Sequence, residues 1–223
     1  MMLRLIIFDC DGVLIDSEPV VNRVVAAELN RLGWPITSEE CCRRFLGLDL
    51  DAMVPLIEAA LGRRLPPAWK DSLANDIIAT LRLESPMIPG ARTALDRVTA
   101  LGIPWRVASN SSHGEMAAKF AANGILHLTA GRTHSFRDVP RGKPAPDLFL
   151  AAAAAEGVTP PECLVVEDSV PGVTGAIAAG MICFGYSPHG NGLALSAAGA
   201  IPFPDMIILP DLIRSLRTRH GRA

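Results

Sequence analysis

Two carboxylates close a short apolar run in the stretch Leu5-Ile6-Ile7-Phe8-Asp9-Cys10-Asp11-Gly12. The run is uninterrupted and β-prone, which is the pattern of a strand buried on both faces. Asp9 and Asp11 are poor core residues, because burying an unpaired charge costs several kcal/mol. At the carboxyl edge of a parallel sheet they would instead line the crevice where α/β proteins bind ligands. A divalent cation that prefers oxygen ligands, such as Mg²⁺, would relieve the repulsion between them.

The composition limits the class of protein. The chain has 223 residues, enough for one large domain or two small ones. Its formal net charge of −2 offers no basic stripe, so we expect no nucleic-acid partner. The cysteines are odd in number and lack C-x-x-C spacing, which favours free thiols in a reducing compartment. They are Cys10, Cys41, Cys42, Cys163 and Cys183.

The sequence pattern predicts neither a membrane-spanning segment nor a signal peptide. No run of about 18 apolar residues is present, so we expect no membrane partner. The apolar start of the chain meets acids at once, and it lacks a long hydrophobic segment and a small-residue cleavage site. We therefore expect a cytoplasmic protein, and we expect a monomer.

Four helices and no strand are predicted between Glu18 and Glu84. Their apolar residues recur at three- and four-residue spacing, and a break is expected at Gly47. The expected ranges are 21–32, 38–45, 51–61 and 68–83. Prolines and Gly90 then mark a change of pattern. We predict that residues 16–85 form a small helical cap and that residues 1–15 and 86–223 form the core.

Helix and strand patterns alternate from Ala91 onward. Strands are predicted over residues 103–108, 126–130, 163–166, 181–184 and 201–203. Helices are predicted over residues 91–101, 115–122, 145–155, 171–179 and 211–217. Such alternation implies parallel pairing with right-handed crossovers. The sequence therefore predicts an α/β fold with a doubly wound parallel sheet.

Polar groups follow three more of these predicted strands or precede their helices. Ser109 and Asn110 could cradle phosphate oxygens at a strand-to-helix turn, although both residues are common in any turn. Lys143 precedes a stiff Pro-Ala-Pro segment, which would aim its ammonium; the alternative is a solvated loop charge. Glu167 and Asp168 again end an apolar run, unless Asp168 merely caps the next helix.

These four segments resemble the ordered motifs of the haloacid dehalogenase-like (HAD) phosphatases. Asp9-Cys10-Asp11-Gly12-Val13-Leu14-Ile15-Asp16-Ser17 is similar to the first motif, and Ser109-Asn110 to the second. Gly142-Lys143-Pro144-Ala145-Pro146 and Glu167-Asp168-Ser169 are similar to the third and fourth. The resemblance covers most of the chain, and the helical insert falls where such proteins carry a cap.

The resemblance implies a mechanism. Asp9 would attack phosphorus and become an aspartyl-phosphate, and Asp11 would serve as general acid and then general base. Mg²⁺ would be held by Asp9, the backbone carbonyl of Asp11 and Asp168, with Glu167 as a further acid. The phosphoryl oxygens would be bound by Ser109, Asn110 and Lys143. The substrate would be a small phosphorylated metabolite.

Other members of the family suggest alternatives. Dehalogenases and phosphonoacetaldehyde hydrolases lack an acid at the place of Asp11. β-Phosphoglucomutase-type transferases share the four motifs, but Val21 replaces their histidine, and Leu46 and Leu50 replace two basic cap residues. We therefore favour hydrolysis over phosphoryl transfer. A non-catalytic protein that binds a phosphometabolite is a further alternative.

The likeness is greatest to 6-phosphogluconate phosphatases, followed by phosphoglycolate phosphatases. It depends on the Asp-Cys-Asp-Gly opening, the Arg43–Gly47 segment and the Ser187–Gly190 loop. Arg43 and Arg44 are candidate substrate-binding residues of the cap. A solvated helix face is the simpler interpretation of that pair.

Overall fold

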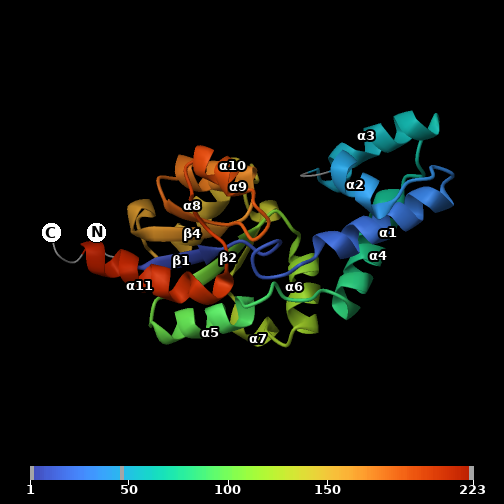
Figure 1. Cartoon of the computed structure of the whole chain (residues 1–223). Helices are drawn as coiled ribbons and strands as arrows, with labels where there is room; N and C mark the ends of the chain where they lie inside the picture. Colours follow the sequence, from blue (N-terminus) through green and yellow to red (C-terminus); the bar gives the residue numbers. More distant parts are fainter. Residues whose placement is uncertain (1–2, 46–47, 221–223) are drawn as a thin grey trace.

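A six-stranded parallel sheet forms the centre of the computed structural model, which describes residues 3–45 and 48–220 (Figure 1). The strand order is β3-β2-β1-β4-β5-β6, and every neighbouring pair is parallel. This arrangement confirms the predicted doubly wound α/β fold. The strands are β1 (Leu5–Phe8), β2 (Trp105–Ser109), β3 (Thr133–Ser135), β4 (Cys163–Glu167), β5 (Ile182–Tyr186) and β6 (Ile201–Phe203).

Helices cover both faces of the sheet (Figure 1). One face carries α8 (Asp147–Ala155), α9 (Val170–Ala178) and α10 (Gly192–Ala197). The other carries α5 (Ala91–Ala100), α6 (His113–Ala122) and α11 (Leu209–His220). The short helix α7 (Leu126–Thr129) follows α6. Three 3₁₀ turns complete the core: η1 (Phe136–Asp138), η2 (Pro160–Glu162) and η3 (Met206–Ile208).

Strand β1 is buried on both faces, as its sequence predicts. Leu5 and Ile7 pack into the cluster beneath α8 and α9, whereas Ile6 and Phe8 pack into the cluster beneath α5 and α6. All four side chains are fully buried. Burial of each contributes roughly 1.5–3 kcal/mol, which fixes this strand in the middle of the sheet.

The four helices between β1 and α5 pack around a hydrophobic cluster of their own and lie to one side of the sheet (Figure 1). They are α1 (Glu18–Arg31), α2 (Ser38–Phe45), α3 (Leu50–Leu61) and α4 (Trp69–Leu83), close to the predicted ranges. Ala118 of α6 joins their cluster, and α4 runs alongside α6. One segment leads from β1 into these helices and another leads from α4 back to α5. The two segments meet where the Asp16 N–H donates to the Pro86 carbonyl at 2.8 Å. Leu46 and Gly47, where the break was expected, lie outside the described residues.

One sequence prediction about the core is wrong, and two elements, β3 and α10, were not predicted. Residues 126–130 do not form a strand, because Leu126–Thr129 is the helix α7. The strand follows instead at Thr133–Ser135, at the edge of the sheet, where three residues pair with β2. Helix α10 was not predicted. A short apolar run has no periodicity that separates a strand from a helix.

The cysteine prediction is confirmed, since all five thiols are free. Among the described residues, none of the helices has the length and apolar character that crossing a membrane would require.

Candidate active site

Asp9 lies at the carboxyl end of β1, where the strand order reverses between β1 and β4. Its N–H donates to the Val166 carbonyl of β4 at 2.9 Å, which extends the ladder by one bond. Its side chain is buried, and Oδ1 accepts from the Cys10 N–H at 2.7 Å. The central strands therefore place this carboxylate at the switch point, where open α/β sheets bind ligands.

Lys143 connects Asp9 with the end of β4. Its Nζ lies 2.7 Å from Asp9 Oδ1 and 2.7 Å from Glu167 Oε1, and its side chain is 4% exposed. Glu167 Oε2 accepts from the Ser169 hydroxyl at 2.9 Å and from the N–H groups of Asp168 and Ser169. The Glu167 carboxylate is thus fully engaged, and it holds the ammonium in place.

Asn110 holds the backbone of Lys143. Its Oδ1 accepts from the Lys143 N–H at 2.9 Å, and its Nδ2 donates to the Lys143 carbonyl at 3.1 Å. The sequence predicted that Asn110 binds substrate. The structure shows its amide bonded to the loop that carries the lysine, and substrate binding by Asn110 stays a prediction.

Two glycines allow the acidic strand ends to approach other backbone closely. A Cβ at Gly172 would lie 1.7 Å from Glu167 Oε1. A Cβ at Gly12 would lie 2.0 Å from Asp168 Oδ2, and Gly12 has φ of +74°. Only glycine fits these positions without displacing a carboxylate.

Three carboxylates gather around Lys143. Asp9, Glu167 and Asp168 each offer an oxygen within 4.8 Å of the others. Burial and the Glu167 carboxylate raise the pKa of Asp9 well above its usual range, and the same two causes raise the pKa of Asp168 to about 8. One ammonium does not balance three acids. The site therefore fits a hard divalent cation such as Mg²⁺, which takes carboxylate oxygens. The Asp11 side chain is outside this group.

The Asp11 carboxylate has a different set of partners. Oδ1 accepts from the Ser17 hydroxyl and from Lys119 Nζ at 2.5 Å. Oδ2 accepts from the hydroxyls of Ser109 at 3.2 Å and Ser111 at 2.7 Å. Burial opposes ionisation of Asp11, but the Lys119 ammonium and these hydrogen bonds outweigh it and lower the pKa to about 2. The predicted residue Ser109 is thus bonded to Asp11.

Lys119, Ser111 and Ser17 were not predicted as site residues. Lys119 carried a recognisable signal, because it is three residues after Met116 and one before Phe120 on the apolar side of α6. A lysine within such a stripe is buried, and a buried ammonium requires a charged partner. The two serines carry no comparable signal, since hydroxyls are common in turns.

The predicted cap residues Arg43 and Arg44 are exposed and have local partners. Arg43 pairs with Glu39 at 3.3 Å, and the Arg44 guanidinium lies 5.6 Å from the centre of the Trp34 ring. Neither contact involves the carboxylate cluster. A role in substrate binding stays a prediction.

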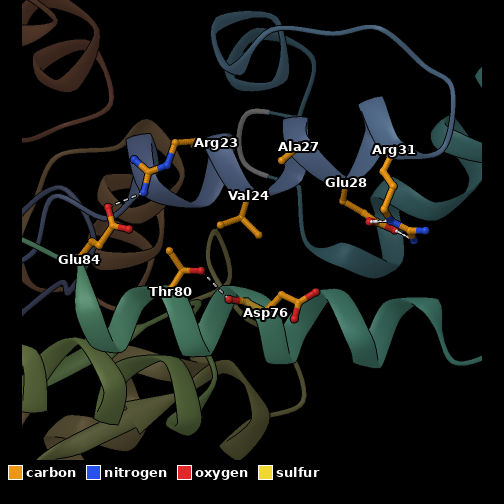
Figure 2. A pocket seen from close by; sticks show the side chains of 8 residues that line it. All are labelled: Arg23, Val24, Ala27, Glu28, Arg31, Asp76, Thr80 and Glu84. Atoms are coloured by element: carbon orange, nitrogen blue, oxygen red, sulfur yellow. Dashed lines mark hydrogen bonds and ion pairs between the residues drawn. The ribbon is translucent and has the colours of Figure 1, made fainter.

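A separate hollow of about 460 Å³ lies between α1 and α4 and is not lined by Asp9, Glu167 or Asp168 (Figure 2). Its charges are largely paired within it: Arg23 with Glu84 at 2.6 Å and Arg31 with Glu28 at 2.7 Å. The hollow shares no lining residue with the cluster at the sheet edge. It is therefore a site distinct from the acidic cluster.

Comparison with known protein families finds a match over most of the chain. Residues 3–180 match the family model described as haloacid dehalogenase-like hydrolase. The chain is 29% identical over 211 residues to 6-phosphogluconate phosphatase of Escherichia coli, with 94% of each chain covered. It is 32% identical over 179 residues to hexitol phosphatase A of the same organism, with 78% of each covered.

Solved structures agree. A conserved haloacid dehalogenase-like protein of unknown function from Agrobacterium tumefaciens superposes with a TM-score of 0.79 at 34% identity, covering 96% of this chain and 99% of that one. A HAD family hydrolase from Deinococcus radiodurans, solved with phosphate and sodium, gives a TM-score of 0.77 at 29% identity, covering 99% and 96%.

Proposed function

The chain belongs to the haloacid dehalogenase-like hydrolase family, and we propose that it is a Mg²⁺-dependent phosphatase acting through an aspartyl-phosphate at Asp9. The observation that carries this proposal is the grouping of Asp9, Glu167 and Asp168 within 4.8 Å around Lys143. Oxygen ligands for a cation, an ammonium for phosphate and a carboxylate nucleophile thus lie together at one edge of the sheet.

Asp9 would start the reaction. Within the described residues, both polar contacts of its side chain fall on Oδ1, which leaves Oδ2 as the attacking oxygen. Attack on phosphorus forms the acyl-phosphate bond and breaks the ester P–O bond, whose electron pair stays on the leaving oxygen. The Lys143 ammonium would stabilise the charge on the phosphoryl oxygens as it moves.

Asp11 would move the protons. Asp11 is ionised in the geometry described here, and the negative charge of a bound phosphate ester beside it favours proton uptake. It would give that proton to the leaving alkoxide, then take one from the water that attacks the phosphoenzyme. Cleavage of the acyl-phosphate bond releases inorganic phosphate and restores Asp9.

The cation site would use the same acids. Asp9, Asp168 and the Asp11 backbone carbonyl would hold the ion, with Glu167 as a further acid. When bound, Mg²⁺ supplies positive charge that shields the repulsion between carboxylate and phosphate. Glu167 is the weakest candidate for direct ligation, because its oxygens already accept from Lys143 and from the turn after β4.

The helical region would act as a cap. Residues 16–85 form the proposed cap and residues 1–15 and 86–223 the core, with cap closure excluding water and selecting the substrate. The relatives named for 6-phosphogluconate and hexitol phosphates support a sugar-phosphate or sugar-acid phosphate as substrate. Arg43 and Arg44 remain the proposed substrate-binding residues of the cap. Ser109 and Asn110 in the core remain proposed ligands of the phosphoryl oxygens.

Phosphate release tests the proposal. The assay uses a panel of sugar phosphates and p-nitrophenyl phosphate, with Mg²⁺ and with a chelator. We expect turnover only with Mg²⁺ and a loss of about 10³-fold or more in Asp9→Asn. The matched control is Asp96→Asn on α5, an exposed acid paired with Arg92, which should leave the rate unchanged.

Other outcomes have defined meanings. Equal rates for wild type and Asp9→Asn would remove Asp9 as the nucleophile. Thermal stabilisation by phosphometabolites without phosphate release would favour a binding protein. Conversion of a hexose 1-phosphate into its 6-phosphate would favour phosphoryl transfer.

A further inference from the structure

A buried lysine outside the four motifs contacts the proposed proton carrier. Lys119 lies on α6, its side chain is 2% exposed, and its Nζ is 2.5 Å from Asp11 Oδ1. We propose that Lys119 is a positioning residue that fixes the Asp11 carboxylate for proton transfer. This inference rests on the proposed function, in which Asp11 is the general acid and base.

Four donors surround the Asp11 carboxylate. Each Asp11 oxygen receives two donors: Lys119 and Ser17 on Oδ1, Ser109 and Ser111 on Oδ2. Lys119 Nζ also donates to Ser111 Oγ at 2.9 Å, which joins the two sides of this clamp. A carboxylate bonded on both oxygens has one orientation, and proton transfer depends on orientation.

The surroundings of the Lys119 side chain are apolar on both sides of its helix. Met116 and Phe120 on the same helix belong to the core cluster beneath the sheet, and Ala118 belongs to the cluster of the helical region. A methionine of similar length would fill that apolar space without desolvating a charge. What the ammonium adds is its bond to Asp11 and Ser111.

Hydrogen bonds from Asn123 tie the helix that carries Lys119 to the connection after α4. Asn123 Nδ2 donates to the Lys119 carbonyl at 2.8 Å and to the Ser85 carbonyl at 2.5 Å. Ser85 belongs to the connection from α4 back to the core. Ser17, the other donor to Oδ1, precedes α1 on the outgoing connection. The clamp is therefore assembled from α6, from the end of β2 with the turn that follows it, and from a segment that enters the helical region.

Leaving-group dependence provides the test. An alkoxide needs a proton as it departs, whereas p-nitrophenolate does not. The constant kcat/KM reports only the steps up to and including the first irreversible one, in which the leaving group departs. A positioning role for Lys119 therefore lowers kcat/KM for an alkyl phosphate and leaves kcat/KM for p-nitrophenyl phosphate unchanged. For Lys119→Met we expect the alkyl phosphate constant to fall by about tenfold to a hundredfold, within the range of general acid catalysis.

A double-mutant cycle separates positioning from stability. In the Asp11→Asn background, Lys119→Met should cause no further loss, because no carboxylate remains to be positioned. Lys119→Arg, which keeps the charge, should recover part of the alkyl phosphate activity. Arg106→Met is the matched control: it removes a largely buried cation paired with Glu156 at 2.9 Å, and it should leave the ratio of the two constants unchanged.

Each outcome decides the inference. Equal losses on both substrates, a full additional loss in the Asp11→Asn background, or a gain on the alkyl phosphate would overturn it. If Lys119→Met does not fold, Lys119→Gln supplies the same comparison with a shorter donor. If Asp11→Asn itself shows no leaving-group dependence, the proposed function fails; if only Lys119→Met shows none, the positioning role alone fails.

Discussion

Asp9 and Asp11 are two residues apart, yet their surroundings differ in charge. Around Asp9, the carboxylates of Glu167 and Asp168 share a single ammonium, that of Lys143. Around Asp11, one ammonium and three hydroxyls serve one carboxylate. The pKa of Asp9 is accordingly raised, whereas that of Asp11 is lowered to about 2.

The difference shows why two neighbouring acids can have separate tasks. The group formed by Asp9, Glu167 and Asp168 has an excess of negative charge, which a bound cation would balance. The Asp11 side is balanced by the protein itself, so it needs no ion. Environment rather than residue type sets the two pKa values apart. The proposed role of Asp9 as nucleophile therefore depends on a bound cation, which favours its ionised form. The proposed role of Asp11 depends on a bound phosphate, which favours its protonated form.

The strongest test of this comparison removes the Lys143 ammonium, which lies beside Asp9. Lys143→Met should lower kcat by roughly 10²–10³-fold, the usual loss for one group that stabilises a transition state. It should also lower the free energy of unfolding by about 3–5 kcal/mol, because Asp9 and Glu167 lose their partner. Steady-state kinetics and urea unfolding measure both. A kcat within twofold of wild type would contradict the electrostatic role.

Cation binding should distinguish the two acids next. Saturating Mg²⁺ at about 100 times its Kd should stabilise the wild type by about 2.7 kcal/mol. Asp168→Asn should lose this stabilisation, because a proposed ligand is gone. Asp11→Asn should keep it, since the proposed ligand there is the backbone carbonyl. Calorimetric unfolding with and without Mg²⁺ checks this; an equal Mg²⁺ effect in Asp168→Asn would contradict the site.

A smaller effect is expected at Asn110, which bonds the Lys143 backbone. Asn110→Ala should lower kcat by about tenfold with little change in KM, because the lysine loses its anchor. In the Lys143→Met background the substitution should add little. A rise in KM with unchanged kcat would instead show that Asn110 acts by binding the substrate directly and not through Lys143.

The smallest expected effect is a pH dependence away from the site. His134 has a lowered pKa, caused by burial and by Arg106, with a smaller contribution from His113; Asp138 and Glu156 act in the opposite sense. The unfolded chain therefore binds more protons just below the ordinary histidine pKa, so stability falls as the pH drops through that value. His134→Gln should lessen the fall, measured as urea midpoints at about pH 7.5 and about pH 5.5. An identical fall in both proteins would contradict it.

Much of the fold could be predicted from strand ends and helix periods. Strand β1 could be predicted because four apolar residues precede Asp9. Strand β4 could be predicted because Glu167 follows another such run. Strand β3 could not be predicted in the same way. Its residues Thr133 and His134 are polar or titratable, and its edge position requires no apolar run.

The site was predictable only in part for a related reason. Residues at strand ends have a place in the sequence pattern, and the structure brings Asp9, Lys143 and Asp168 together. The partners of Asp11 depend on packing between distant segments. Lys119 reaches Asp11 across 108 positions of sequence, and only its place on an apolar stripe hinted at burial.

The central claim is that Asp9 carries the phosphoryl group during turnover. The direct measurement is acid quenching during turnover with Mg²⁺, followed by borohydride reduction and peptide mass spectrometry, since reduction converts an aspartyl-phosphate into homoserine. The account predicts homoserine at position 9, dependent on substrate and absent in Asp9→Asn. Homoserine at position 11 or 168, or none at any residue while phosphate is released, would contradict it.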